Sequence, residues 1–107
     1  MEKTDAIAAL AALAQDNRLD VFRLLVQAGP EGMQAGAVAE ALELAPNTLT
    51  FHFDRLRMAR LVTARRDGRS VIYAAQYEKM NALIAFLTQN CCGDAPAAAR
   101  KRNKVPA

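Results

Sequence analysis

The chain has 107 residues, of which 52% are hydrophobic, and this length accommodates one small domain with short tails. Alanine supplies 23 of the hydrophobic residues, so the chain favours helices while its stock of large core side chains is modest. No run approaches the roughly 18–20 apolar residues of a membrane span, residues 1–5 do not open a secretory signal, and two adjacent cysteines cannot build a disulfide framework. We therefore expect a soluble cytoplasmic protein, in which a subunit partner helps to bury the remaining apolar surface.

The net charge of +3 is distributed unevenly along the chain. Residues 1–54 carry eight acidic and three basic side chains, whereas residues 55–69 carry six arginines and one aspartate. Four more basic residues follow residue 99. Positive charge concentrated in one short block is typical of a surface that binds a polyanion such as nucleic acid.

Four helices are expected before residue 60. The first has an apolar side formed by Ile7, Leu10, Ala11 and Leu13. The second, over residues 18–26, is apolar on most of its circumference and should lie at the centre of the domain, ending at Gly29-Pro30. A short third helix follows the 3.6-residue period through residues 38–42.

The fourth helix opens at Ala45-Pro46-Asn47, where proline suits the first helical position. Its inner face is predicted to consist of Leu49, Phe53 and Leu56. The residues left on its other faces are Thr48, Thr50, Phe51, His52 and Arg55.

The period then changes to that of strands. Residues 61–65 and 71–74 are β-prone and flank Asp67-Gly68, a pair typical of a hairpin turn. A last helix is expected from about Tyr77 to Asn90. Its apolar stripe consists of Met80, Leu83, Ile84 and Leu87, and Cys91 extends it. We assign residues 1–92 to the folded domain and residues 93–107 to a disordered basic tail.

Two short helices followed by an arginine-tipped hairpin describe a winged helix-turn-helix, whose second helix enters the major groove of DNA. Base-edge contacts are predicted for Asn47, Thr48, Thr50 and His52, with Arg55 on the same helix. The hairpin would reach phosphates or a minor groove through Arg65, Arg66 and Arg69. Phe51 has two interpretations: contact with a thymine methyl group, or packing on neighbouring side chains.

These elements together resemble the ArsR-type metalloregulatory repressors. The matching segments are residues 14–25 (AQDNRLDVFRLL), 38–42 (VAEAL), 48–56 (TLTFHFDRL), 61–62 (LV) and 67–73 (DGRSVIY). The resemblance implies a mainly α fold of order α-α-α-α-β-β-α and a homodimer paired through its first and last helices. It also implies a repressor that leaves inverted-repeat operator DNA when an inducer binds.

The chain departs from the family pattern at several positions. Ala45 stands where a capping serine is common, and Arg60 stands where glycine usually precedes the wing, so Arg60 must accept that turn's backbone or shift it. The positions that match the cysteine site of the third helix are Gln34, Gly36 and Ala39. With one histidine in the chain, the zinc site that relatives carry on the last helix is not expected.

The remaining candidate sensor is the pair Cys91-Cys92, which resembles a subgroup that binds trivalent arsenic with a vicinal cysteine pair and a third cysteine, absent here. Thiolates are soft ligands that suit trivalent arsenic or antimony. The third sulfur could come from a small thiol or the other subunit, whereas an organoarsenical needs only two.

Three alternatives stay open at this stage. Cys91-Cys92 could instead sense oxidants, although adjacent cysteines close only a strained ring. Cys91 could be a buried small hydrophobe, which leaves Cys92 unexplained. The helices could also serve a protein partner without DNA. We expect no enzyme, because the chain offers no catalytic set, and we expect no required cofactor.

Overall fold

The computed structural model describes residues 1–94. Of the tail expected over residues 93–107, residues 93 and 94 belong to a 3-10 turn and residues 95–107 lie outside the described residues. The helices are α1 (Lys3–Leu13), α2 (Asp16–Ala28), α3 (Ala35–Leu42), α4 (Pro46–Met58) and α5 (Tyr77–Leu87). The strands are β1 (Met33–Gln34), β2 (Val62–Asp67) and β3 (Ser70–Ala75), and a 3-10 turn, η1, spans Cys91–Asp94. This is the expected winged helix-turn-helix, with one additional short strand.

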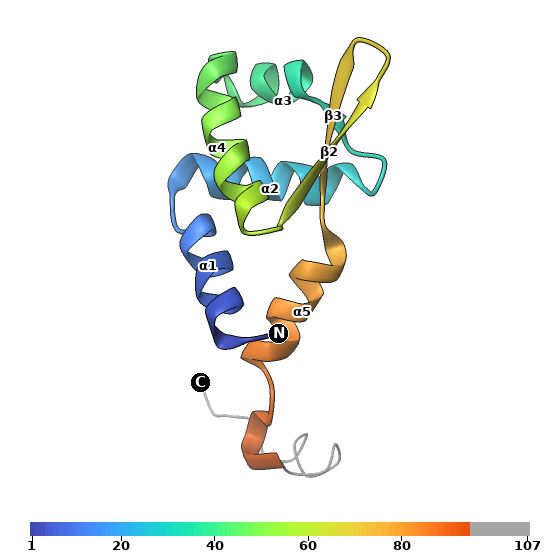
Figure 1. The fold of residues 1–107 in the computed structure, drawn as a ribbon. Helices are drawn as coiled ribbons and strands as arrows, with labels where there is room; N and C mark the ends of the chain where they lie inside the picture. The colour runs from blue at the N-terminus through green and yellow to red at the C-terminus, as the bar shows by residue number, and fades with distance from the viewer. Residues whose placement is uncertain (95–107) are drawn as a thin grey trace.

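Helix α2 lies at the centre of the domain, as its apolar circumference predicts, and contacts α1, α3, α4 and β3. Its Val21 and Leu25 are fully buried, because they face the core from the middle of the helix. In Figure 1 the helix pair α3–α4 and the hairpin lie at one end of the molecule, whereas α1 and α5 lie at the other. This arrangement separates the proposed DNA-binding elements from the two helices expected to form a dimer.

The hairpin forms where Asp67-Gly68 predicts it, with Asp67 paired to Ser70 and Gly68 in the left-handed region at φ +64°. The sheet also contains β1, which pairs antiparallel with β3 and gives the order β1-β3-β2. This strand is not predicted from the sequence, because two residues are too short to show a period. Gly32 permits the pairing, since a Cβ there would overlap the carbonyl oxygen of Tyr73.

The turn between α4 and the wing keeps its backbone conformation although Arg60 replaces the usual glycine. Arg60 lies at φ +64°, and its N–H donates to the carbonyl oxygen of Arg57 at 2.9 Å. The N–H of Leu61 donates to the carbonyl oxygen of Leu56 at 3.1 Å. These two bonds form a Schellman motif, so Arg60 accepts a left-handed conformation that normally favours glycine.

The apolar side of α1 differs from the sequence prediction. The side that faces the domain consists of Ala6, Ala9 and Ala12, whereas Ile7 and Leu10 are 56% and 42% exposed. Alanine lets α1 approach its neighbours closely, so the large side chains face outward. The prediction was wrong for Ile7 and Leu10, because the pattern alone does not show which apolar face meets the protein's own core, whereas Leu13 does pack against the core.

The stripe on α5 divides into two parts. Leu83 is buried and Met80 packs against the core, whereas Ile84 and Leu87 are 52% and 58% exposed. The helix ends at Leu87, three residues before the predicted Asn90. Cys91 therefore does not continue the helical stripe as expected, and its side chain is exposed.

Candidate nucleic-acid interface

Helix α4 is held on the domain by the inner face that the sequence predicts. Leu49, Phe53 and Leu56 are almost completely buried. The Phe53 ring stacks on the ring of Tyr73 from β3, with centroids 3.6 Å apart and planes 11° from parallel. Burial raises the pKa of the Tyr73 hydroxyl, so the group stays neutral. This contact fixes the helix relative to the wing.

The first turn of α4 presents small polar side chains to solvent. Asn47 and Thr50 are exposed, and Thr48 is half-buried. Asn47 Oδ1 accepts a hydrogen bond from the N–H of Thr48 at 2.9 Å, which partly replaces the cap that Ala45 cannot supply. The Thr50 hydroxyl donates to the carbonyl oxygen of Pro46 at 3.0 Å and also forms a side-chain hydrogen bond with Tyr73, which leaves one lone pair of its oxygen for a further donor.

His52 does not lie on the exposed face, so its expected position beside the bases is wrong. Its side chain is 7% exposed, and its Nδ1 has no hydrogen-bond partner among the described residues. Burial lowers the pKa of His52 from 6.5, and the positive charge of Arg18 lowers it further. Helices α1 and α2 pack against α4, and the buried face of α4 includes His52 in addition to Leu49, Phe53 and Leu56.

Phe51 and Arg55 form a unit one turn apart on an exposed face of α4. The Arg55 guanidinium lies 5.2 Å from the centroid of the Phe51 ring, within the range of a cation–π contact. Phe51 also meets the ring of His52 edge-on at 5.6 Å. Its packing on neighbours agrees with one of the two interpretations, although its side chain remains 53% exposed.

The wing carries three exposed arginines. Arg65 donates a hydrogen bond from Nη2 to the carbonyl oxygen of Glu31 at 3.0 Å, which ties the hairpin to the loop before β1. Arg66 faces Val71 across the hairpin, and Arg69 occupies its tip. The start of α4 and the tip of the β2–β3 hairpin, the segments that carry these side chains, lie at the same end of the molecule (Figure 1).

The two cysteines lie at the opposite end of the chain's folded part, in η1 after α5. Their sulfur atoms are 3.3 Å apart, longer than the about 2.05 Å of a disulfide bond. Cys92 has a left-handed backbone, at φ +62°. Within residues 1–94 no group of three or more His, Cys, Asp and Glu side chains is arranged to hold a metal ion.

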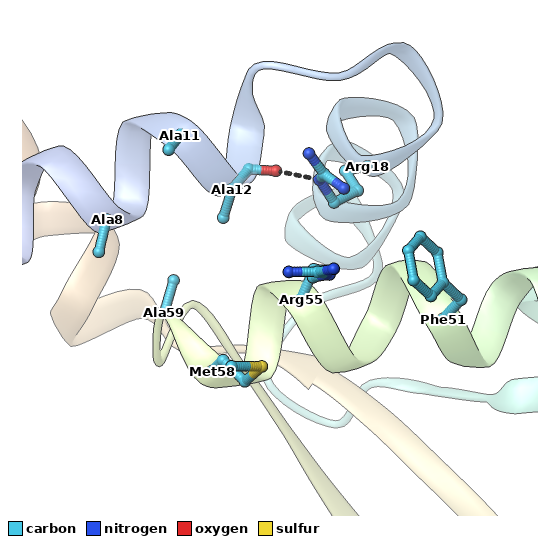
Figure 2. Close-up of a pocket in the computed structure, with 8 residues that line it drawn as sticks. All are labelled: Ala8, Ala11, Ala12, Arg18, Phe51, Arg55, Met58 and Ala59. Carbon is cyan, nitrogen blue, oxygen red and sulfur yellow. Dashed lines mark hydrogen bonds between the residues drawn. The ribbon is translucent and has the colours of Figure 1, made fainter.

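A further feature that the sequence analysis missed is a cavity of about 540 Å³ between α1, α2 and α4 (Figure 2). It is lined by Ala8, Ala11, Ala12, Arg18, Phe51, Arg55, Met58 and Ala59. No signal in the sequence marks this cavity, because its lining residues come from separate helices and meet only when these helices pack together.

Comparison with known proteins agrees with this geometry. A family model described as a helix-turn-helix domain matches residues 13–65. The regulator YgaV of Escherichia coli, described as an HTH-type transcriptional regulator, is 30% identical over 87 residues, which are 81% of this chain and 86% of that protein. The chain therefore belongs to the helix-turn-helix family of transcriptional regulators.

Two solved structures share the fold. NolR from Sinorhizobium fredii has a TM-score of 0.63 at 31% identity, with 82% of this chain and 85% of that chain covered. An ArsR-like transcriptional regulator from Rhodococcus sp. RHA1 has a TM-score of 0.73 at 20% identity, with 96% of each chain covered. The present chain therefore has the same fold as this ArsR-like regulator. No helix among residues 1–94 is both long and apolar enough to cross a membrane.

Proposed function

We propose that the protein is a homodimeric transcriptional repressor that binds operator DNA through α4 and the wing. The observation that carries the proposal is the polar first turn of α4, at the same end of the molecule as the hairpin that carries the three wing arginines (Figure 1). Asn47, Thr48 and Thr50 would contact base edges, and the arginines would contact phosphates. Phe51 and Arg55 would flank the groove, whereas the buried His52 would support α4 from within.

The dimer is supported by the outward apolar residues of two helices. Ile7 and Leu10 on α1 and Ile84 and Leu87 on α5 are all between 42% and 58% exposed. A second copy that covers these side chains supplies the core that the alanine-rich monomer lacks. Such a dimer would also present two α4 helices, one for each half of an inverted-repeat operator.

The inducer of the proposed repressor is trivalent arsenic or antimony bound by Cys91 and Cys92. Two sulfur atoms 3.3 Å apart, one from an exposed side chain, can both reach a single soft atom. A trivalent organoarsenical needs these two sulfurs alone, so we expect it to act at least as well as arsenite. Binding at the end of α5 would change the dimer contacts and lower the affinity for DNA.

DNA binding is tested with an operator selected from a random library by the protein itself. Arg66→Ala should weaken binding to all sequences and reduce the slope of log affinity against log salt by about one. Thr50→Ala should relax the sequence preference and leave the salt slope unchanged. Lys3→Ala, at the start of α1, is the control and should change neither quantity. Equal responses of Arg66→Ala and Thr50→Ala would refute the assigned roles.

The dimer is tested by Ile84→Asp, measured by light scattering at micromolar concentration. The buried charge should give a monomer and abolish tight operator binding. Ala85→Asp places the same charge on an exposed neighbour about 100° around the helix and should remain dimeric. Monomeric wild type, or a monomeric Ala85→Asp variant, would contradict the proposed interface.

The inducer is tested by release from operator DNA with arsenite, phenylarsine oxide and peroxide. The Cys91→Ser/Cys92→Ser double variant should bind DNA normally and resist both arsenicals. If the double variant is released as readily as wild type, the cysteine pair is not the sensor. Release by peroxide alone would favour the second candidate, a thiol switch, which the 3.3 Å approach of the two sulfurs also supports.

A further inference from the structure

The cavity between α1, α2 and α4 has mainly apolar walls. Ala8, Ala11 and Ala12 form its wall on α1. Met58 and Ala59 line the cavity at the carboxyl end of α4 (Figure 2). Its volume of about 540 Å³ is within the range of small-molecule sites. The alanines create this space, because any larger side chain on that face of α1 would fill it.

Two guanidinium groups give the cavity its charge. Arg18 is half-buried, and its Nε donates to the carbonyl oxygen of Ala12 at 2.7 Å, which leaves its terminal nitrogens for another partner. Arg55 is held over the Phe51 ring at 5.2 Å. None of the eight lining residues is acidic. The nearby Asp54 instead lies 3.6 Å from Arg57, which does not line the cavity.

We propose that this cavity binds a small aromatic carboxylate. A planar carboxylate matches the fork of an arginine side chain, and Arg18 and Arg55 present two such forks to the cavity (Figure 2). The aromatic body would then pack against the alanines of α1 and against Met58 and Ala59, on the side of Arg55 away from Phe51 (Figure 2). An inorganic anion would satisfy the arginines and leave the apolar walls uncovered, so the organic part contributes to the selectivity.

The site also reaches the proposed DNA-binding helix. Phe51 and Arg55 belong to α4, and we place both at the DNA groove, a point that rests on the proposed function. A carboxylate that holds Arg55 toward α1 withdraws its charge from the DNA. The ligand should therefore weaken operator binding in addition to any effect of the cysteine pair.

The test uses the whole protein without DNA, so its result is independent of the proposed function. Benzoate is titrated into isotope-labelled protein, and amide chemical shifts are followed by NMR. We expect saturable shifts at Ala8, Ala12 and Ala59, with a dissociation constant of about 1 mM or lower. Benzamide, which has the same shape without the charge, should bind about tenfold more weakly.

Matched variants locate the site. Arg55→Gln should weaken benzoate binding about tenfold, whereas Arg57→Gln, two residues away and outside the cavity, should leave it within about twofold. Ala11→Leu fills the cavity from an exposed position and should abolish binding, whereas Ala41→Leu, exposed on α3, should not.

Several results would overturn the proposal. Benzoate that does not bind at about 10 mM would mean that the cavity is closed in solution, for example by a second copy of the chain. Sulfate binding as tightly as benzoate would indicate a plain anion site, such as one for a DNA phosphate. Equal effects of Arg55→Gln and Arg57→Gln, or retained binding by Ala11→Leu, would place the ligand elsewhere.

Discussion

Arg60, which follows α4, has a left-handed backbone conformation, and replacing it allows the backbone strain at this turn to be measured. Arg60 has φ +64°, and the two Schellman hydrogen bonds hold it there. A left-handed conformation costs a residue with a Cβ about 1–2 kcal/mol. Glycine removes this cost but gains freedom in the unfolded chain, which offsets part of it. We therefore expect Arg60→Gly to raise the free energy of unfolding by about 1 kcal/mol, or the Tm by about 4–8 °C.

The measurement is thermal and urea unfolding followed by circular dichroism at one fixed protein concentration, because dimerisation makes the Tm concentration-dependent. Arg60→Ala is the control: it removes the same charge and keeps a Cβ. Its stability should stay within about 0.5 kcal/mol of wild type. If alanine stabilises the protein as much as glycine does, the effect comes from the charge. An unchanged or lower Tm for Arg60→Gly would refute the strain argument.

Three further predictions concern single side chains. Gly32→Ala should lower the free energy of unfolding by more than about 2 kcal/mol in urea, since its Cβ would overlap the Tyr73 carbonyl; stability equal to wild type would contradict the close approach of β1. Burial lowers the pKa of His52 from 6.5, so the unfolded chain binds the proton at a higher pH than the folded chain does. The free energy of unfolding should therefore fall as the pH drops below about 6.5, and His52→Gln should remove this loss. Tyr77→Phe should cost about 1 kcal/mol in urea unfolding, because the hydroxyl donates to the Val26 carbonyl oxygen at 2.8 Å; no change would show that water replaces the bond.

The order of the elements could be predicted from the sequence because each depends on local signals. The 3.6-residue period marks α2 and the inner face of α4, and Pro46 marks where α4 begins. The pair Asp67-Gly68 specifies a turn whose geometry only a few residue types adopt. The arginines of the wing lie in or beside this turn, and they are exposed because both faces of β2 after Val62 are open to solvent.

The tertiary structure decided what depends on contacts between distant segments. Strand β1 exists because β3 offers it an edge, and two residues carry no period of their own. His52 is buried because α1 and α2 pack against α4, so the buried face of α4 is wider than the stripe of Leu49, Phe53 and Leu56. The buried face of α1 consists of alanines, and Ile7 is exposed. The hydrophobic pattern of a single helix does not show which of its two apolar faces contacts the domain. The cavity between Arg18 and Arg55 arises in the same way, since the two residues are 37 positions apart and meet only when α2 and α4 pack together.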